Sequence, residues 1–135
     1  MKSRVVFSSA SVEWGTPSGV YEELNREFGF TLDPCPLGGD DNGLSTLFMP
    51  WENQRVWINP PYAKIRPWLE RWREPELAVY LIPSRTDCRW FHDIVLPHAT
   101  EIRFIRGRLK FGGATNSAPF PSVIIVFDNR GKPYR

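Results

Sequence analysis

The chain has 135 residues, enough for one domain with one hydrophobic core and too few for two. No window approaches the ~18 uninterrupted apolar residues of a membrane-spanning helix. Charge is uneven: residues 1–60 carry 4 Lys and Arg against 8 Asp and Glu, and residues 61–135 carry 13 against 7. We therefore expect one compact domain over residues 1–135, with 1–13 and 128–135 less ordered and a basic C-terminal half of the kind that nucleic-acid surfaces need.

The N-terminal apolar patch, Val5 to Phe7, is shorter than the ~7–15-residue core of a secretory signal, so we expect a cytoplasmic protein. The two cysteines, Cys35 and Cys88, belong to no CxxC or Cys/His cluster, and the histidines lack ligand spacing. The sequence thus predicts no disulfide framework and no metal site.

The first clear element is a helix from about Pro17 to Phe28, after a short strand at residues 5–7. Thr16 is a good N-cap, Pro17 suits the first helical position, and Gly29 ends the run. Apolar residues recur at helical spacing within it: Val20, Leu24 and Phe28.

Strands and helices alternate in the rest of the chain. Strands are predicted at residues 30–32, 55–58, 77–82, 101–105 and 122–127, helices at 65–72 and at 90–95 before Pro97, and a turn or hairpin loop at 107–113. The continuous apolar run at 77–82 is typical of a strand buried on both faces. This alternation predicts an α/β fold with a mostly parallel central sheet flanked by helices.

Two polar loops follow predicted strands, and in parallel sheets ligands bind beyond the carboxyl ends of the strands. The first loop is Asp33-Pro34-Cys35-Pro36 and the second is Asn59-Pro60-Pro61-Tyr62. If their strands are neighbours, both loops face the same site.

The second loop suits methyl transfer to an exocyclic amine such as N6 of adenine, a poor nucleophile because its lone pair is delocalised. The amide oxygen of Asn59 can accept one N–H and the carbonyl of Pro60 the other, which orients the nitrogen without a strong base. Pro60 and Pro61 make the loop rigid, and Tyr62 offers a face on which a base can stack. A duplex base must be flipped to reach such a pocket.

From Trp14 to Phe127 the sequence resembles the short, phage-type Dam-like DNA N-6-adenine methyltransferases. The matching stretches follow the order of that family: Trp14 to Pro17, Glu27 to Cys35, Trp57 to Tyr62, Leu81 to Asp87 with Trp90 to His92, and Gly107 to Phe111.

The resemblance implies a Rossmann-like methyltransferase domain that uses S-adenosylmethionine and acts on DNA in a bacterial host or phage-infected cell. The cofactor-binding residues implied are Trp14, Thr16, Pro17, Asp33, Pro34, Cys35, Asp41 and Asn59, with Asp41 or its neighbour Asp40 holding the ribose. Residues Asn59 to Tyr62 form the implied catalytic loop. Thr16-Pro17 as a helix cap and Asp33 as a turn former are the structural alternatives.

Basic and aromatic residues supply the implied DNA contacts: Tyr62, Lys64, Arg85, Arg106, Arg108, Lys110 and Phe111. The cluster Arg103, Arg106, Arg108 and Lys110 favours phosphate contacts over a solvated face. Phe111 can either stack on the second face of a flipped base or pack in the core or a loop. The tryptophans Trp68, Trp72 and Trp90 have helical spacing and are expected mostly in the core.

Other functions remain open at this point. A methyltransferase of this fold can act on RNA adenine, cytosine N4 or a protein glutamine, and a nucleic-acid-binding module without catalysis would also be small. The chain lacks the glycine-rich turn common after the first strand of methyltransferases and an obvious target-recognition domain. Sequence specificity would then come from loops or from a second copy in a homodimer, or be weak.

Overall fold

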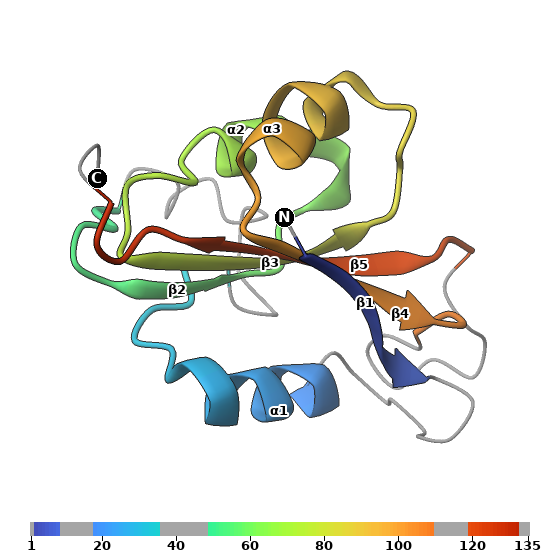
Figure 1. Cartoon of the computed structure of the whole chain (residues 1–135), viewed down its shortest axis with the longest axis horizontal. Helices are drawn as coiled ribbons and strands as arrows, with labels where there is room; N and C mark the ends of the chain where they lie inside the picture. The colour runs from blue at the N-terminus through green and yellow to red at the C-terminus, as the bar shows by residue number, and fades with distance from the viewer. Residues whose placement is uncertain (1, 9–17, 36–48, 110–118, 133–135) are drawn as a thin grey trace.

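The computed structural model describes residues 2–8, 18–35, 49–109 and 119–132. Within them a five-stranded sheet has the order β1-β4-β5-β3-β2 (Figure 1). Its strands are β1 (Lys2–Ser8), β2 (Arg55–Ile58), β3 (Leu77–Pro83), β4 (Glu101–Arg106) and β5 (Ser122–Asp128). The strands predicted from sequence are thus present, except the one at residues 30–32.

The sheet is mixed, which corrects the expectation of a mostly parallel one. β1 pairs with β4 and β2 with β3 in parallel, whereas β5 is antiparallel to both β3 and β4. The four other strands therefore share one direction. β5 runs back beside β4, and antiparallel neighbours of this kind do not need the long crossover connection that joins parallel strands.

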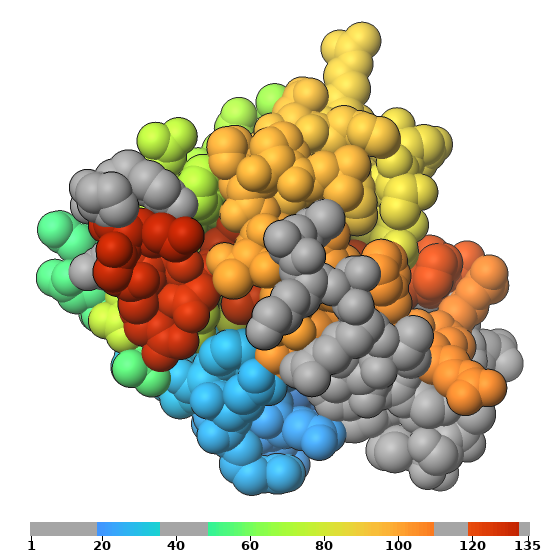
Figure 2. Space-filling view, in the orientation of Figure 1, coloured from blue at the N-terminus to red at the C-terminus, as the bar shows by residue number. Residues whose placement is uncertain are grey.

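Helical segments cover both faces of the sheet (Figures 1 and 2). In the space-filling view α1 (Ser18–Phe28, blue) lies along one side of the molecule, and η3 (Phe91–Val95) and α3 (Leu96–His98) lie along the opposite side. The short segments η2 (Tyr62–Lys64) and α2 (Arg66–Leu69) belong to the second layer.

β3 separates two hydrophobic clusters because its side chains alternate between faces and every one is buried. Leu77, Val79 and Leu81 pack with the apolar face of α1, while Ala78, Tyr80 and Ile82 pack with the opposite layer. Trp68 and Trp72 are buried in that second cluster as expected, and Trp90 packs against it partly buried.

Two helices differ from the prediction. The helix expected at 65–72 is a regular α-helix only at Arg66–Leu69. It continues as tighter turns, in which Trp72 N–H donates to Leu69 O three residues back, as in a 3₁₀-helix. The helix expected to stop before Pro97 passes through it to His98. A π-turn at 91–95, in which Leu96 N–H reaches back to Phe91 O, accommodates the proline, which has no N–H to donate.

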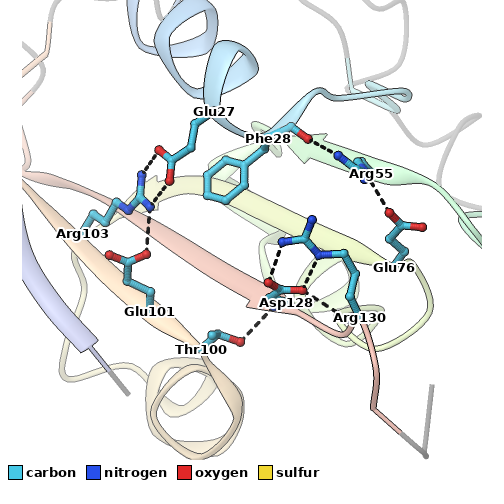
Figure 3. A network of polar contacts seen from close by, with 9 residues as sticks. All are labelled: Glu27, Phe28, Arg55, Glu76, Thr100, Glu101, Arg103, Asp128 and Arg130. Carbon is cyan, nitrogen blue, oxygen red and sulfur yellow. Dashed lines mark hydrogen bonds and ion pairs between the residues drawn. The ribbon is translucent and has the colours of Figure 1, made fainter.

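The end of α1 is tied to β2. Gly29 adopts a positive φ of 64°, and its N–H donates to Asn25 O at 2.8 Å, a typical helix C-terminus. Arg55 donates through Nη1 to the carbonyl of Phe28 at 3.0 Å and through Nε to Glu76 at 2.8 Å (Figure 3). Arg55 therefore supplies a hydrogen-bond donor for a carbonyl at the end of α1, and it holds the chain that follows α1 beside β2.

Arg103 is a structural residue, which corrects its assignment to phosphate contact. Its side chain is only 3% exposed and forms a bidentate pair with Glu27 of α1, at 2.6 and 2.5 Å, and a further bond to Glu101 at 2.9 Å (Figure 3). These carboxylates raise the pKa of the guanidinium, with the hydrogen bond to Glu27 the largest cause. The side chain of Arg103 leaves β4 on the face that α1 covers, and residue spacing in the sequence does not reveal this.

We expect Glu27→Ala to lower the free energy of unfolding by about 1–2 kcal/mol, because it leaves a buried guanidinium with one carboxylate and Glu27 itself is partly screened by solvent. Glu23→Ala is the matched control: it removes an exposed glutamate from the same helix and should change stability by less than about 0.5 kcal/mol. Urea denaturation measures both. Equal losses in the two variants would contradict a stabilising role for the Glu27–Arg103 pair.

Candidate active site

The two polar loops identified from sequence lie at the same edge of the sheet. Leu32 forms a parallel bridge with Val56, and Trp57 N–H donates to Leu32 O at 3.0 Å. The segment before Asp33 thus runs beside β2 in the same direction, although only as a single bridge rather than a full strand. Asp33 follows Leu32 at the edge where Asn59 follows Ile58.

The catalytic loop predicted from sequence is held from several sides. Asn59 and Tyr62 are half-buried and Pro60 is buried. The hydroxyl of Tyr62 donates to Oδ1 of Asn59 at 3.1 Å, and Lys64 N–H donates to Pro61 O at 3.0 Å, which closes the turn into η2. Burial raises the pKa of the Tyr62 hydroxyl, so it stays protonated and remains a donor.

The segment Phe120–Ser122 completes this side of the site, and sequence reasoning missed it. The ring of Phe120 meets the ring of Tyr62 edge-on, with centroids 5.4 Å apart at 80°. Ser84 N–H donates to Pro121 O at 2.9 Å, which joins the end of β3 to the start of β5. The signal for Phe120 was present as an aromatic between two prolines just before a buried strand, but nothing in the spacing linked it to Tyr62.

Ser122, the first residue of β5, is also buried at this edge, opposite Pro83 of β3. Its Oγ forms no hydrogen bond with any of the residues that the structure describes.

Asp33 is the carboxylate of the site. It is exposed by area, yet the protein atoms around its carboxyl group desolvate it enough to raise its pKa, an effect that the N–H of Cys35, donating at 3.2 Å, opposes. The hydrogen bond from Cys35 N–H to the Asp33 carboxylate stabilises the turn, so Asp33 also acts as the turn former that the sequence offered as an alternative. A carboxylate that the fold destabilises in this way is suited to a cationic ligand.

Tyr62 is half-buried, whereas the basic residues predicted to contact DNA are exposed where the structure describes them: Lys64, Arg85, Arg106 and Arg108. They lie at or beyond the carboxyl ends of β2, β3 and β4, on the same side as Asp33 and Asn59. The predicted site residues Trp14, Thr16, Pro17, Asp41, Lys110 and Phe111 lie outside the described residues.

Among the residues that the structure describes, no three His, Cys, Asp or Glu side chains come together as a metal site would need. In the same ranges no helix is long and apolar enough to span a membrane.

The comparison with known families decides the identity of the chain. The family model described as DNA N-6-adenine-methyltransferase (Dam) matches residues 6–135. The chain belongs to the Dam family of DNA N-6-adenine methyltransferases. It is similar to the DNA N-6-adenine-methyltransferase of Haemophilus phage HP1, with 26% identity over 141 aligned positions that cover 90% of this chain and 80% of the phage protein. No solved structure matches it.

Membership of the Dam family confirms the resemblance drawn from the ordered motifs and implies a Rossmann-like methyltransferase fold. The mixed sheet is compatible with this, because four strands share one direction, the Asn59 loop follows β2 of that set, and the segment before Asp33 runs parallel to β2.

We expect Asp33→Asn to increase the stability of this Dam-family protein at neutral pH. The folded state raises the pKa of Asp33, so it disfavours the carboxylate relative to the unfolded chain. The penalty is absent below the unfolded pKa of about 3.9 and appears as pH rises through the folded value. Asparagine keeps an oxygen for the Cys35 N–H and carries no charge.

Urea denaturation of both proteins at pH 7 and near pH 3 measures this, with Asp87→Asn, which changes an exposed aspartate in the turn after β3, as the control. A variant that is less stable than the parent at pH 7 would show that the Asp33 carboxylate stabilises the fold rather than being held for a ligand.

Proposed function

We propose that this protein transfers a methyl group from S-adenosylmethionine to the exocyclic N6 amine of adenine in DNA. The observation that supports this most is the placement of the Asp33 and Asn59 loops at one sheet edge, in a chain that belongs to the Dam family. One loop offers a carboxylate and the other offers amide and carbonyl oxygens, which together suit a cationic methyl donor and an amine acceptor.

The residues of the first loop fit the cofactor by their chemistry. When bound, S-adenosylmethionine supplies an electrophilic methyl group on a positively charged sulfur, beside the ammonium of its methionine end. The Asp33 carboxylate is half surrounded by protein and disfavoured as an isolated charge, so a neighbouring cation would lower its pKa again and gain binding energy in return. Pro34 and Cys35, buried and half-buried, hold the turn in place.

The residues of the second loop activate the amine. In the proposed reaction adenine N6 attacks the methyl carbon, the new N–C bond forms as the C–S bond breaks with its electron pair leaving on sulfur, and the amine loses one proton to water. Oδ1 of Asn59 and the carbonyl of Pro60 accept the two N–H groups and turn the nitrogen lone pair toward the methyl group. The Pro60-Pro61 pair keeps these two acceptors in a rigid turn.

The DNA strand is proposed to lie along the basic residues of the same edge. Lys64, Arg85, Arg106 and Arg108 are exposed at or after the carboxyl ends of β2, β3 and β4, with β5 lying between β3 and β4, and there they can contact phosphates on either side of a flipped nucleotide. The flipped base would enter beside Tyr62, whose ring is backed by Phe120. Loops of this domain or a second copy of the chain would read the surrounding bases.

Incubation with methyl-labelled S-adenosylmethionine and adenine-containing DNA, followed by mass analysis of the digested nucleosides, tests this function. We expect N6-methyladenine as the product and a loss of at least about 100-fold in kcat for Asn59→Ala, with cofactor affinity within about tenfold of the parent, because Asn59 acts mainly in the transition state.

Asn53→Gly, which removes the amide of an exposed asparagine ahead of β2 and suits its positive φ of 62°, is the control and should retain turnover. A product methylated at cytosine N4, on RNA or on a glutamine amide would replace the DNA-adenine substrate. Unchanged turnover in Asn59→Ala would show that the chemistry lies elsewhere.

A further inference from the structure

Tyr62 is fixed at both ends of its side chain. Its hydroxyl donates to Oδ1 of Asn59 at 3.1 Å, and its ring meets Phe120 edge-on while packing against the hydrophobic cluster on the side of α2 and η3. A ring that only provided a stacking surface would need no such hydroxyl contact. The bond joins Tyr62 to the residue whose orientation matters most for the proposed reaction.

The side-chain amide of Asn59 has two orientations of nearly the same shape. In one, Oδ1 faces the base and accepts an N–H; in the other, Nδ2 presents two donors to an amine that is itself a donor. Proline neighbours restrain the backbone of the loop but do not select between these orientations. In the structure the Tyr62 hydroxyl donates to Oδ1, which holds the amide in one orientation; the opposite orientation would require the hydroxyl to accept from Nδ2 instead.

We propose that the Tyr62 hydroxyl is a positioning group that holds the Asn59 amide with its oxygen available to the target amine. This rests on the proposed function. Oδ1 has two lone pairs, so one can bind Tyr62 while the other accepts the N–H of the base. The stacking surface of the ring is a separate contribution that a phenylalanine would retain.

A double-mutant cycle separates the two contributions. In the parent, Tyr62→Phe should lower kcat about fivefold, the effect of one lost hydrogen bond, with little change in KM. In the Asn59→Asp background the same substitution should change kcat by less than about twofold, because a carboxylate has two equivalent oxygens and no wrong orientation.

Phe120→Leu is the matched control. It removes the ring contact and leaves the hydroxyl, so any loss should be similar in both backgrounds. Equal losses from Tyr62→Phe in the two backgrounds, or no loss in the parent, would overturn the positioning role and assign Tyr62 to stacking or packing alone.

An independent readout needs no turnover. In ¹⁵N-labelled protein, nuclear Overhauser contacts of the Asn59 Nδ2 protons should place them away from Tyr62 in the parent, and Tyr62→Phe should redistribute them to both sides. Unchanged contacts in Tyr62→Phe would overturn the proposal. If the parent lacks methyltransferase activity on DNA, the proposed function fails while this measurement still decides whether Tyr62 orients the amide.

Discussion

The parallel alignment of the chain before Asp33 with β2 is the constraint on which the site depends. One backbone bridge, Leu32 with Val56, sets the register, and Arg55 secures it by bonding to the end of α1. A shift of one residue would turn Asp33 to the other face of the sheet. The hydroxyl of Thr31 adds a side-chain contact between the two segments by accepting from Arg55 N–H at 2.8 Å. Because both segments run in one direction, the residues that follow them meet at a single edge.

Rigidity at that edge comes from aromatic and proline residues rather than from ion pairs. Pro60 and Pro61 limit the loop, and Tyr62 is held by Asn59 and Phe120. The strong ion pairs lie elsewhere: the Glu27–Arg103 pair joins α1 to β4 over the buried face of the sheet. Within the described ranges, Asp33 and the basic residues at this edge take part in none of the ion pairs, whereas Glu27 and Arg103 are paired with each other.

Sequence patterns predicted the strands and the two motif loops because burial and strand ends leave local signals, such as the apolar run at 77–82 and the double proline at 60–61. Sequence patterns did not predict features that depend on contacts between distant parts of the chain. The antiparallel direction of β5 depends on its neighbours, and the burial of Arg103 depends on a glutamate 76 residues away. The contact of Phe120 with Tyr62 joins segments that no periodicity connects. Local propensity alone predicts only turns at Asp33 and Asn59. The ordered family motifs were needed to identify them as candidate site residues.

The central claim is that Asp33 and Asn59 face one cofactor at this edge. Binding S-adenosylmethionine carrying a ¹³C-labelled transferable methyl group, and measuring nuclear Overhauser contacts from that methyl, tests it most directly. We expect contacts to the side chains of Asn59 and Tyr62. Contacts instead to residues at the opposite ends of the strands, such as Glu76 or Asn129, would contradict it.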